Sequence, residues 1–242
     1  MTGVQTCALP ISFRKYSSNA LRRLGLRTKA RIFARLSWRG HAATELTVPF
    51  GAVAVLSGRL LEVGGAGLAR RTLRVVLRPS GGAIGKARVV SIGTGLQGSF
   101  RLPLPAGTSR RIAISFRGEK RLDGASRRPL TLRVRSGIEL RVVPGSLHTG
   151  EVVRFDGRVR TLGAPLPRRG KLVAIQYFEQ AASRWRPVLF TRTDHSGRFR
   201  ARYRFRYVSG SANVRLRAIA LSEERWPYAP GSSPPVTVHV TG

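Results

Sequence analysis

Five arginines occupy every second position between residues 198 and 206, and this row is the clearest candidate for binding chemistry in the sequence. In a half-buried antiparallel strand, the alternate residues, which include Phe199 and Tyr203, would face the core and the arginines would face water. Neighbouring arginines on that face would stand about 6.6–6.8 Å apart and could contact several phosphate, sulfate or carboxylate groups. The candidate polyanion site includes two arginines expected on an adjacent strand and consists of Arg198, Arg200, Arg202, Arg204, Arg206, Arg215 and Arg217. The alternative is a solvated sheet face without a ligand.

Catalytic and metal-binding residue types are present, but their spacing does not favour a site. Asp194-His195-Ser196 has the residue types of a catalytic triad, yet three consecutive residues cannot align nucleophile, base and orienting group. The segment Thr193–Gly197 instead indicates a hairpin turn. The four histidines are far apart, and the adjacent pair Glu223-Glu224 would point to opposite faces of a strand. We therefore expect no enzyme activity, no bound metal and no cofactor.

Aromatic residues offer a second kind of contact, to sugars or bases. Trp226 and Tyr228 lie in a Pro-rich loop, which makes them the candidate aromatic contact, since exposed rings can stack on a ligand. One Trp per sandwich usually lies in the core, so we expect Trp185 to pack in a core or on a sheet.

The charge of the chain is strongly positive and spread along its length. The sequence has 44 Lys and Arg residues, 39 of them Arg, against 11 Asp and Glu, which gives a net charge of +33. A dedicated nucleic-acid site usually concentrates its charge, so no specific nucleic-acid partner is expected. We favour the codon bias of a GC-rich genome as the cause, and polyanions such as envelope polymers or acidic glycans are the alternative partners.

The N-terminal residues 1–11 are expected to be an artefact. Residues 2–11 resemble the translation of a common sequencing-library adapter, so the native start, with any signal peptide, would be missing. Cys7 is the single cysteine and falls within this stretch, which excludes a disulfide framework in the native part. No apolar run approaches the ~20 residues that span a bilayer.

The remaining sequence repeats itself at an interval of about 99 residues. Ser57-Gly58-Arg59-Leu60 returns as Asp156-Gly157-Arg158-Val159, and Gly98-Ser99-Phe100 returns as Gly197-Arg198-Phe199. Within each unit, apolar residues recur with a period of two and the breaks are rich in Gly and Pro, which predicts short strands.

We therefore predict an all-β fold with two tandem immunoglobulin-like β-sandwich domains, at residues 48–136 and 137–242. A further strand is predicted within residues 12–47, because every second residue is apolar at Ile32, Ala34, Leu36 and Trp38. We assign residues 12–47 to the tail of a truncated preceding unit or to a linker. A basic helix on a membrane surface is the alternative for this segment.

Three segments give the second unit a resemblance to known repeats: Gly170–Gln176, Trp185–Val188 and Thr193–Phe199. They resemble the tandem immunoglobulin-like repeats of bacterial exported proteins, and also the carboxypeptidase-regulatory-like (prealbumin-like) modules. The first unit departs from the pattern, since Thr94–Gly98 lacks the Asp and no Trp matches Trp185. The resemblance implies an extracellular or cell-envelope location and a non-catalytic role as spacer, adhesion or binding module.

Three functions follow from the sequence. The leading one is a non-catalytic fragment of a bacterial exported or cell-surface protein. The second is a polyanion-binding module that uses the arginine-rich sheet face, by electrostatics rather than by reading a sequence. The third is a set of accessory domains attached to an upstream enzyme.

Overall fold

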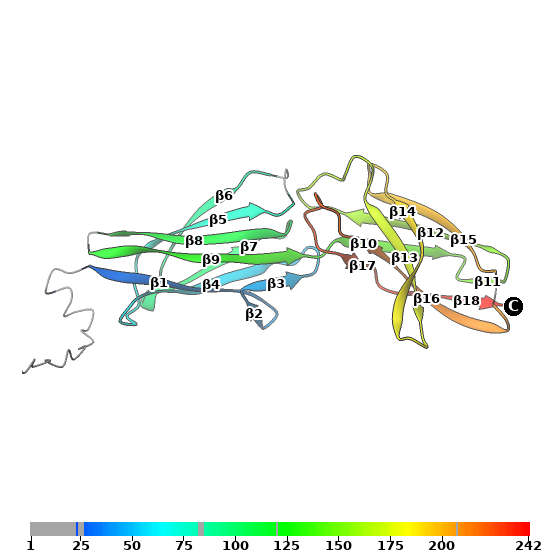
Figure 1. Cartoon of the computed structure of the whole chain (residues 1–242), viewed down its shortest axis with the longest axis horizontal. Coiled ribbons are helices and arrows are strands. Elements are labelled where there is room, and N and C mark those ends of the chain that lie inside the picture. The colour runs from blue at the N-terminus through cyan, green and yellow to red at the C-terminus, as the bar shows by residue number, and fades with distance from the viewer. Residues whose placement is uncertain (1–22, 24–26, 82–84, 120, 207) are drawn as a thin grey trace, which may run out of the picture.

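The computed structural model describes residues 23, 27–81, 85–119, 121–206 and 208–242, so the predicted artefact at residues 1–11 lies outside the described part. The described residues form eighteen β-strands, which confirms the all-β prediction. The strands make two bodies in succession, which we call the N-terminal sandwich (28–134) and the C-terminal sandwich (137–241) (Figure 1). That each sandwich folds as a separate domain stays a prediction.

The N-terminal sandwich has two layers. One has the strand order β1-β4-β7 and the other the order β3-β9-β8-β5-β6, while β2 forms a hairpin with β1. The layers are continuous where β1 and β9 pair in parallel through Thr28 and Lys29. The strands are β1 (Thr28–Trp38), β2 (His41–Ala43), β3 (Glu45–Val48), β4 (Ala54–Glu62), β5 (Thr72–Pro79), β6 (Arg88–Gly93), β7 (Ser99–Leu104), β8 (Arg110–Glu119) and β9 (Leu122–Val134).

The C-terminal sandwich repeats this arrangement. A three-stranded sheet has the order β10-β12-β15, and a six-stranded sheet has the order β11-β18-β16-β13-β14 with β17 paired to β16. Two mainly antiparallel sheets packed face to face with this division of strands form an immunoglobulin-like sandwich; β11 and β18 pair in parallel. The strands are β10 (Gly137–Val143), β11 (Ser146–His148), β12 (Val152–Arg160), β13 (Leu172–Glu179), β14 (Arg184–Arg192), β15 (Arg198–Arg204), β16 (Ser211–Ala220), β17 (Gly231–Ser232) and β18 (Val236–Thr241).

The repeated sequence motif has a structural cause. Gly58 pairs with Phe100 across β4 and β7, and Gly157 pairs with Phe199 across β12 and β15. A Cβ atom added to Gly58 would lie 2.6 Å from the Phe100 ring, and one added to Gly157 would lie 2.2 Å from the Phe199 ring. Each phenylalanine therefore covers a glycine on the inner face of the sheet, and a larger residue there would displace the ring.

The start of the N-terminal sandwich differs from the prediction. Residues 28–38 form the predicted strand, and its alternate residues from Thr28 to Leu36 are buried. However, β1 pairs with β4 from Ala30 to Ser37, and β3 pairs with β9. The assignment of residues 12–47 to a preceding unit or linker is therefore wrong from residue 28 onward, because these strands complete the first sandwich. Alternation identifies a strand, but it does not identify the strand's partner.

The turn predicted at Thr193–Gly197 is confirmed, and it starts the arginine-bearing strand β15. The Asp194 carboxylate accepts hydrogen bonds from the Ser196 hydroxyl and from the backbone N–H groups of Ser196 and Arg198, at 2.8, 2.8 and 3.0 Å. These bonds, the one from the Ser196 hydroxyl above all, hold the pKa of Asp194 below its usual value. Gly197 supplies the positive φ of +83° that closes the turn.

Candidate functional site

The arginine row exists on β15. Arg198, Arg200, Arg202 and Arg204 are exposed and alternate with residues packed against the core, and Arg206 is exposed just beyond the strand. Phe199 is buried, while Ala201, Tyr203 and Phe205 are half-buried. Tyr207, the last member of the predicted inner row, lies outside the described residues. The period-two pattern therefore predicted correctly which side of this strand meets water.

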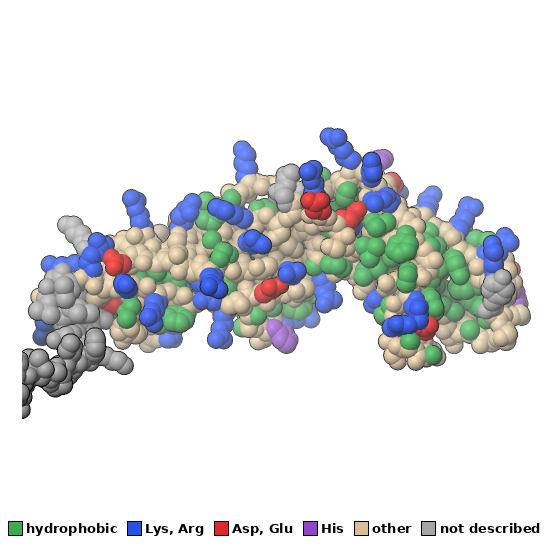
Figure 2. Space-filling view, in the orientation of Figure 1, with side chains coloured by type: hydrophobic (Ala, Val, Ile, Leu, Met, Phe, Trp, Pro, Cys, Tyr) green, Lys and Arg blue, Asp and Glu red, His purple; other side chains and the backbone are tan. Residues whose placement is uncertain are grey.

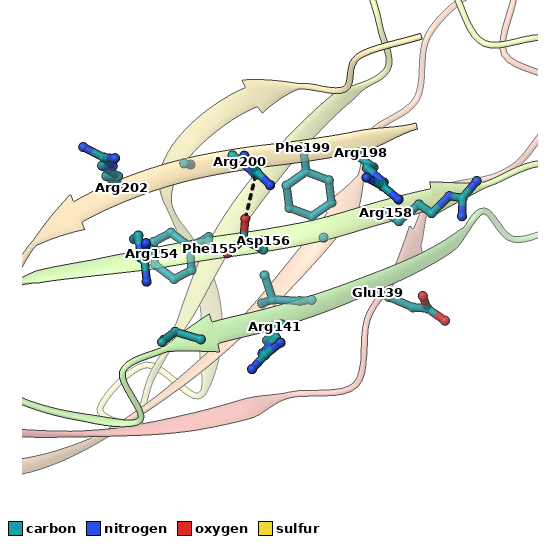
Figure 3. Close-up of a pocket in the computed structure, with 14 residues that line it drawn as sticks. Glu139, Arg141, Arg154, Phe155, Asp156, Arg158, Arg198, Phe199, Arg200 and Arg202 are labelled. Carbon is teal, nitrogen blue, oxygen red and sulfur yellow. Dashed lines mark ion pairs between the residues drawn. The ribbon is translucent and has the colours of Figure 1, made fainter. Parts of the chain in front are cut away.

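The strands beside β15 extend the site with arginines that sequence reasoning missed. On β12, Arg158 lies opposite Arg198 and Arg154 lies opposite Arg202. Between these two pairs, Asp156 lies opposite Arg200, and Arg141 of β10 lies on its other side. We call the outward side chains of these three strands the arginine face, made of Glu139, Arg141, Arg154, Asp156, Arg158, Arg198, Arg200 and Arg202 (Figure 3). The alternation of Arg154, Asp156 and Arg158 with buried residues was the signal available in the sequence.

The arginine face lines an open trough of about 860 Å³. Phe155 and Phe199 lie beneath it and belong to the buried core, so the strands that carry the arginines are anchored from below. Rigid strands hold charged groups in register better than a loop would, because each position is fixed by cross-strand hydrogen bonds. The trough can therefore present cations at fixed spacings to an elongated ligand.

Few of these arginines have an acidic partner. The Arg200 Nε lies 3.1 Å from Asp156 Oδ1, and both side chains are well exposed. At the end of the face, Arg160 pairs with Glu139 at 2.5 Å. Among the described residues, the ion pairs do not include Arg154, Arg158, Arg198 or Arg202. Both cross-strand arginine pairs thus place two positive charges side by side. Glu139 of β10 lies opposite Arg158, but its carboxylate is paired with Arg160.

Arg215 and Arg217 are not part of this face, contrary to the prediction. They lie on β16, which belongs to the other sheet of the sandwich. The guanidinium carbon of Arg217 lies 4.1 Å from the centre of the Trp185 ring, and that of Arg215 lies 5.2 Å from the Phe178 ring. The chain passes from one sheet to the other between β15 and β16, so neighbours in sequence are not neighbours in a sheet.

Trp185 packs on the six-stranded sheet, which was one of the two environments expected for it. Its ring lies 5.3 Å from that of Phe178 in an edge-on arrangement, and it is half-buried beneath Arg217. The Arg217 Nε also donates a hydrogen bond to the Gln176 side chain at 2.9 Å. Arg215 and Arg217 therefore stack on aromatic rings of the six-stranded sheet.

Trp226 and Tyr228 are buried, so the prediction of an exposed aromatic contact is wrong. Only 5% and 4% of these residues are exposed. The Trp226 indole donates to the Ser136 hydroxyl at 2.8 Å, and the Tyr228 ring lies 5.9 Å from that of Phe50 in the N-terminal sandwich. The Pro-rich loop signals an irregular segment correctly, but here that segment lies between two sandwiches and is covered by both.

A buried ion pair adjoins these aromatic residues. The Lys171 side chain is fully buried, and its Nζ lies 2.6 Å from Glu223 Oε2 and 5.1 Å from the centre of the Trp226 ring. Arg192 approaches the other oxygen of Glu223 at 3.1 Å. Burial lowers the pKa of Lys171. Burial alone would raise the pKa of Glu223, but the hydrogen bonds from Lys171 and the Leu172 N–H outweigh it, so the pKa lies below its usual value.

Other kinds of site find no support in the described part of the chain. Within it, no three His, Cys, Asp or Glu side chains come together in a way that could hold a metal ion. None of the helices described is long and apolar enough to cross a membrane. Basic side chains are distributed along both sandwiches (Figure 2), so what distinguishes the arginine face is its arrangement rather than its sign.

No family model and no curated protein matches the sequence. Three solved structures can be set beside it. The adhesin InvE of Yersinia pseudotuberculosis is 10% identical over 87% of this chain and 58% of that chain, with a TM-score of 0.35. Native alpha-2-macroglobulin of E. coli is 14% identical over 87% of this chain and 14% of that chain, at 0.34. The Escherichia coli adhesin FdeC is 13% identical over 90% and 65%, at 0.33.

This chain spans less than two thirds of the length of each of these three structures. TM-scores this low do not transfer a function or a binding partner from them. The resemblance to carboxypeptidase-regulatory-like modules stays a prediction.

Proposed function

We propose that the chain is a non-catalytic extending module of an exported or cell-surface protein. In this role it holds the parts on either side of it at a fixed distance and direction. The observation that carries the proposal is the junction between the sandwiches, where two linking residues and a buried loop leave little freedom to bend. The resemblance to repeats of exported proteins supports the location.

The path of the chain fits this role. β1 starts at the outer end of the N-terminal sandwich, and the C-terminus lies at the outer end of the C-terminal sandwich (Figure 1). The described chain thus runs from one end of the molecule's long axis to the other (Figure 1). Arg135 and Ser136 alone separate the last strand of one sandwich from the first strand of the other.

The loop at residues 226–230 fastens the two sandwiches at this point. The loop backbone forms hydrogen bonds with two residues of the N-terminal sandwich and one of the link. The Pro227 carbonyl accepts from the Ser109 N–H at 2.9 Å, and the Ala229 N–H donates to the Val134 carbonyl at 2.8 Å. The Ala229 carbonyl accepts from the Ser136 N–H at 2.9 Å. Sandwiches joined by a flexible linker would reorient freely. Here a bend would break hydrogen bonds and expose buried rings, which favours one orientation.

Small-angle X-ray scattering on the full chain tests the proposal. We expect the scattering of a single extended particle, and Trp226→Ala should broaden it toward bent shapes because the anchor to Ser136 and the ring packing are lost. Trp185→Ala is the matched control, since it removes a Trp from the same sandwich away from the junction. The proposal fails if the unaltered chain already samples bent shapes or if the two variants behave alike.

A further inference from the structure

The two cross-strand arginine pairs on the C-terminal sandwich are the feature that the extending role leaves unexplained. Arg158 with Arg198, and Arg154 with Arg202, are direct cross-strand partners on the solvent side of β12 and β15. Side chains at such positions are about 4.5–5.5 Å apart at Cβ, and like charges directly opposite each other destabilise a sheet. A fold that needed only a solvated surface gains nothing from this placement.

The two pairs are spaced regularly along the strands. Arg154 and Arg158 are four residues apart on β12, as are Arg198 and Arg202 on β15, so the pairs are separated by about 13 Å. Between them, Asp156 is paired with Arg200 at 3.1 Å, and Arg141 lies on the other side of Asp156 (Figure 3). On β12 and β15 the two arginine pairs therefore lie on either side of an Asp–Arg ion pair.

We propose that each arginine pair is an anion clamp and that the two clamps together bind a linear acidic polysaccharide lying along the trough. An anionic group placed between two guanidinium groups accepts hydrogen bonds from both and relieves their mutual repulsion. The planar guanidinium fork suits carboxylate and sulfate oxygens. The inference goes beyond the proposed extending role and does not depend on it.

The composition of the face favours a polysaccharide over single-stranded nucleic acid. Proteins that bind single strands combine a basic groove with aromatic side chains on which the bases stack. Among the described residues that line the trough, the aromatic side chains are Phe155 and Phe199, and both are buried in the core. The face thus offers cations at fixed spacing without a platform for bases.

The N-terminal sandwich provides an internal control with the same strand order. At its equivalent positions, Arg59 lies opposite Ser99, Ser57 opposite Arg101, and Val55 opposite Pro103. This face also carries arginines, but it has no cross-strand arginine pair between β4 and β7, and among the described residues the other sheet of this sandwich has a single exposed pair, Arg78 opposite Arg111. Generic attraction to the net charge of +33 would act on both sandwiches, whereas a ligand that bridges two clamps would bind only along β12 and β15.

The experiment measures binding of fluorescent heparin hexasaccharide and disaccharide to the full chain by anisotropy, in a salt series that spans physiological ionic strength. The clamp variants are Arg154→Gln/Arg202→Gln and Arg158→Gln/Arg198→Gln. The matched control, Arg31→Gln/Arg35→Gln, removes the same charge at the same four-residue spacing from the exposed side of β1. Circular dichroism checks that each variant is folded.

We expect each clamp variant to weaken hexasaccharide binding about tenfold and to lower the slope against log salt by about two, since each lost contact releases about one counterion fewer. The control should change affinity less than about twofold. The unaltered chain should prefer the hexasaccharide to the disaccharide by about tenfold or more, since a ligand that bridges both clamps gains avidity. Either clamp variant should lose that preference.

Three results would overturn the proposal. Equal weakening by the clamp and control variants would mean that binding follows net charge alone. Absence of a length preference in the unaltered chain would mean that the pairs do not act together. Tighter binding of oligo-dT than of the hexasaccharide at equal ligand charge, with the same sensitivity to the clamp variants, would assign the face to nucleic acid instead.

Discussion

The two sandwiches share a strand order and an inner architecture, yet their outer faces differ. Inside, the pair Gly58–Phe100 is repeated by Gly157–Phe199, and each phenylalanine covers its glycine. Outside, Ser99 is replaced by Arg198 and Ser57 by Asp156, so the second face gains an arginine pair beside an Asp–Arg ion pair. The core of a repeat is constrained by packing, whereas its outer face is free to acquire binding chemistry.

Each sandwich contains an ion pair, and the two pairs differ in burial. This difference gives the largest expected effect on the unfolding free energy. Lys171–Glu223 is buried in the C-terminal sandwich, while Arg71–Glu119 of the N-terminal sandwich is exposed. Glu223→Gln should cost about 3 kcal/mol of unfolding free energy because it leaves a buried ammonium without its carboxylate. Glu119→Gln should cost less than about 1 kcal/mol. Urea unfolding of both variants measures the two losses, and similar losses would contradict the comparison.

Acid should weaken the C-terminal sandwich through the same pair. The pKa of Glu223 is lower in the folded protein than its usual value, so its contribution is complete above the usual value and is lost as pH falls through the lowered one. We therefore expect the unfolding free energy to fall as the pH drops below the usual range of a glutamate. Glu223→Gln should flatten this dependence, as measured by urea unfolding across a pH series. An unchanged pH profile in the variant would assign the dependence to other groups.

Adding an arginine pair to the N-terminal sandwich tests whether pairing itself increases binding to an outer face. Ser99→Arg places an arginine opposite Arg59, which recreates one cross-strand pair on the N-terminal face. We expect heparin hexasaccharide binding to rise by about two- to threefold, because an anion can then be shared by two guanidinium groups. Ser126→Arg is the matched control, since it adds the same charge at an exposed position of β9 that lies opposite Ser115. Equal gains from the two additions would show that pairing is irrelevant.

The smallest expected effect is a gain in stability when a clamp is dismantled. Arg154→Gln removes one of two like charges that lie directly opposite each other, so the unfolding free energy should rise by about 0.2–1 kcal/mol at low salt. The gain should shrink as salt screens the repulsion. Arg35→Gln on the N-terminal face, where the partner across β4 is Ser57, should give no such gain. Thermal unfolding at two salt concentrations distinguishes the two cases.

Local patterns predicted much of this molecule. Alternation predicted the all-β fold and the exposed side of β15, and the Asp–Gly pattern predicted the turn before it. The neighbours of β15 were not predictable in this way, because β12 lies far earlier in the chain and a local period does not specify pairing. The burial of Trp226 likewise depends on the adjoining sandwich, which no pattern within its own loop reveals.

Our proposal is that heparin binding centres on the two regularly spaced arginine pairs of β12 and β15. Protection of arginines from phenylglyoxal, measured by mass spectrometry with and without heparin hexasaccharide, tests it most directly. We expect protection of Arg154, Arg158, Arg198 and Arg202, with no change at Arg31, Arg35 and Arg101 of the N-terminal face. Equal protection of both groups would contradict the claim and leave only a diffuse attraction to net charge.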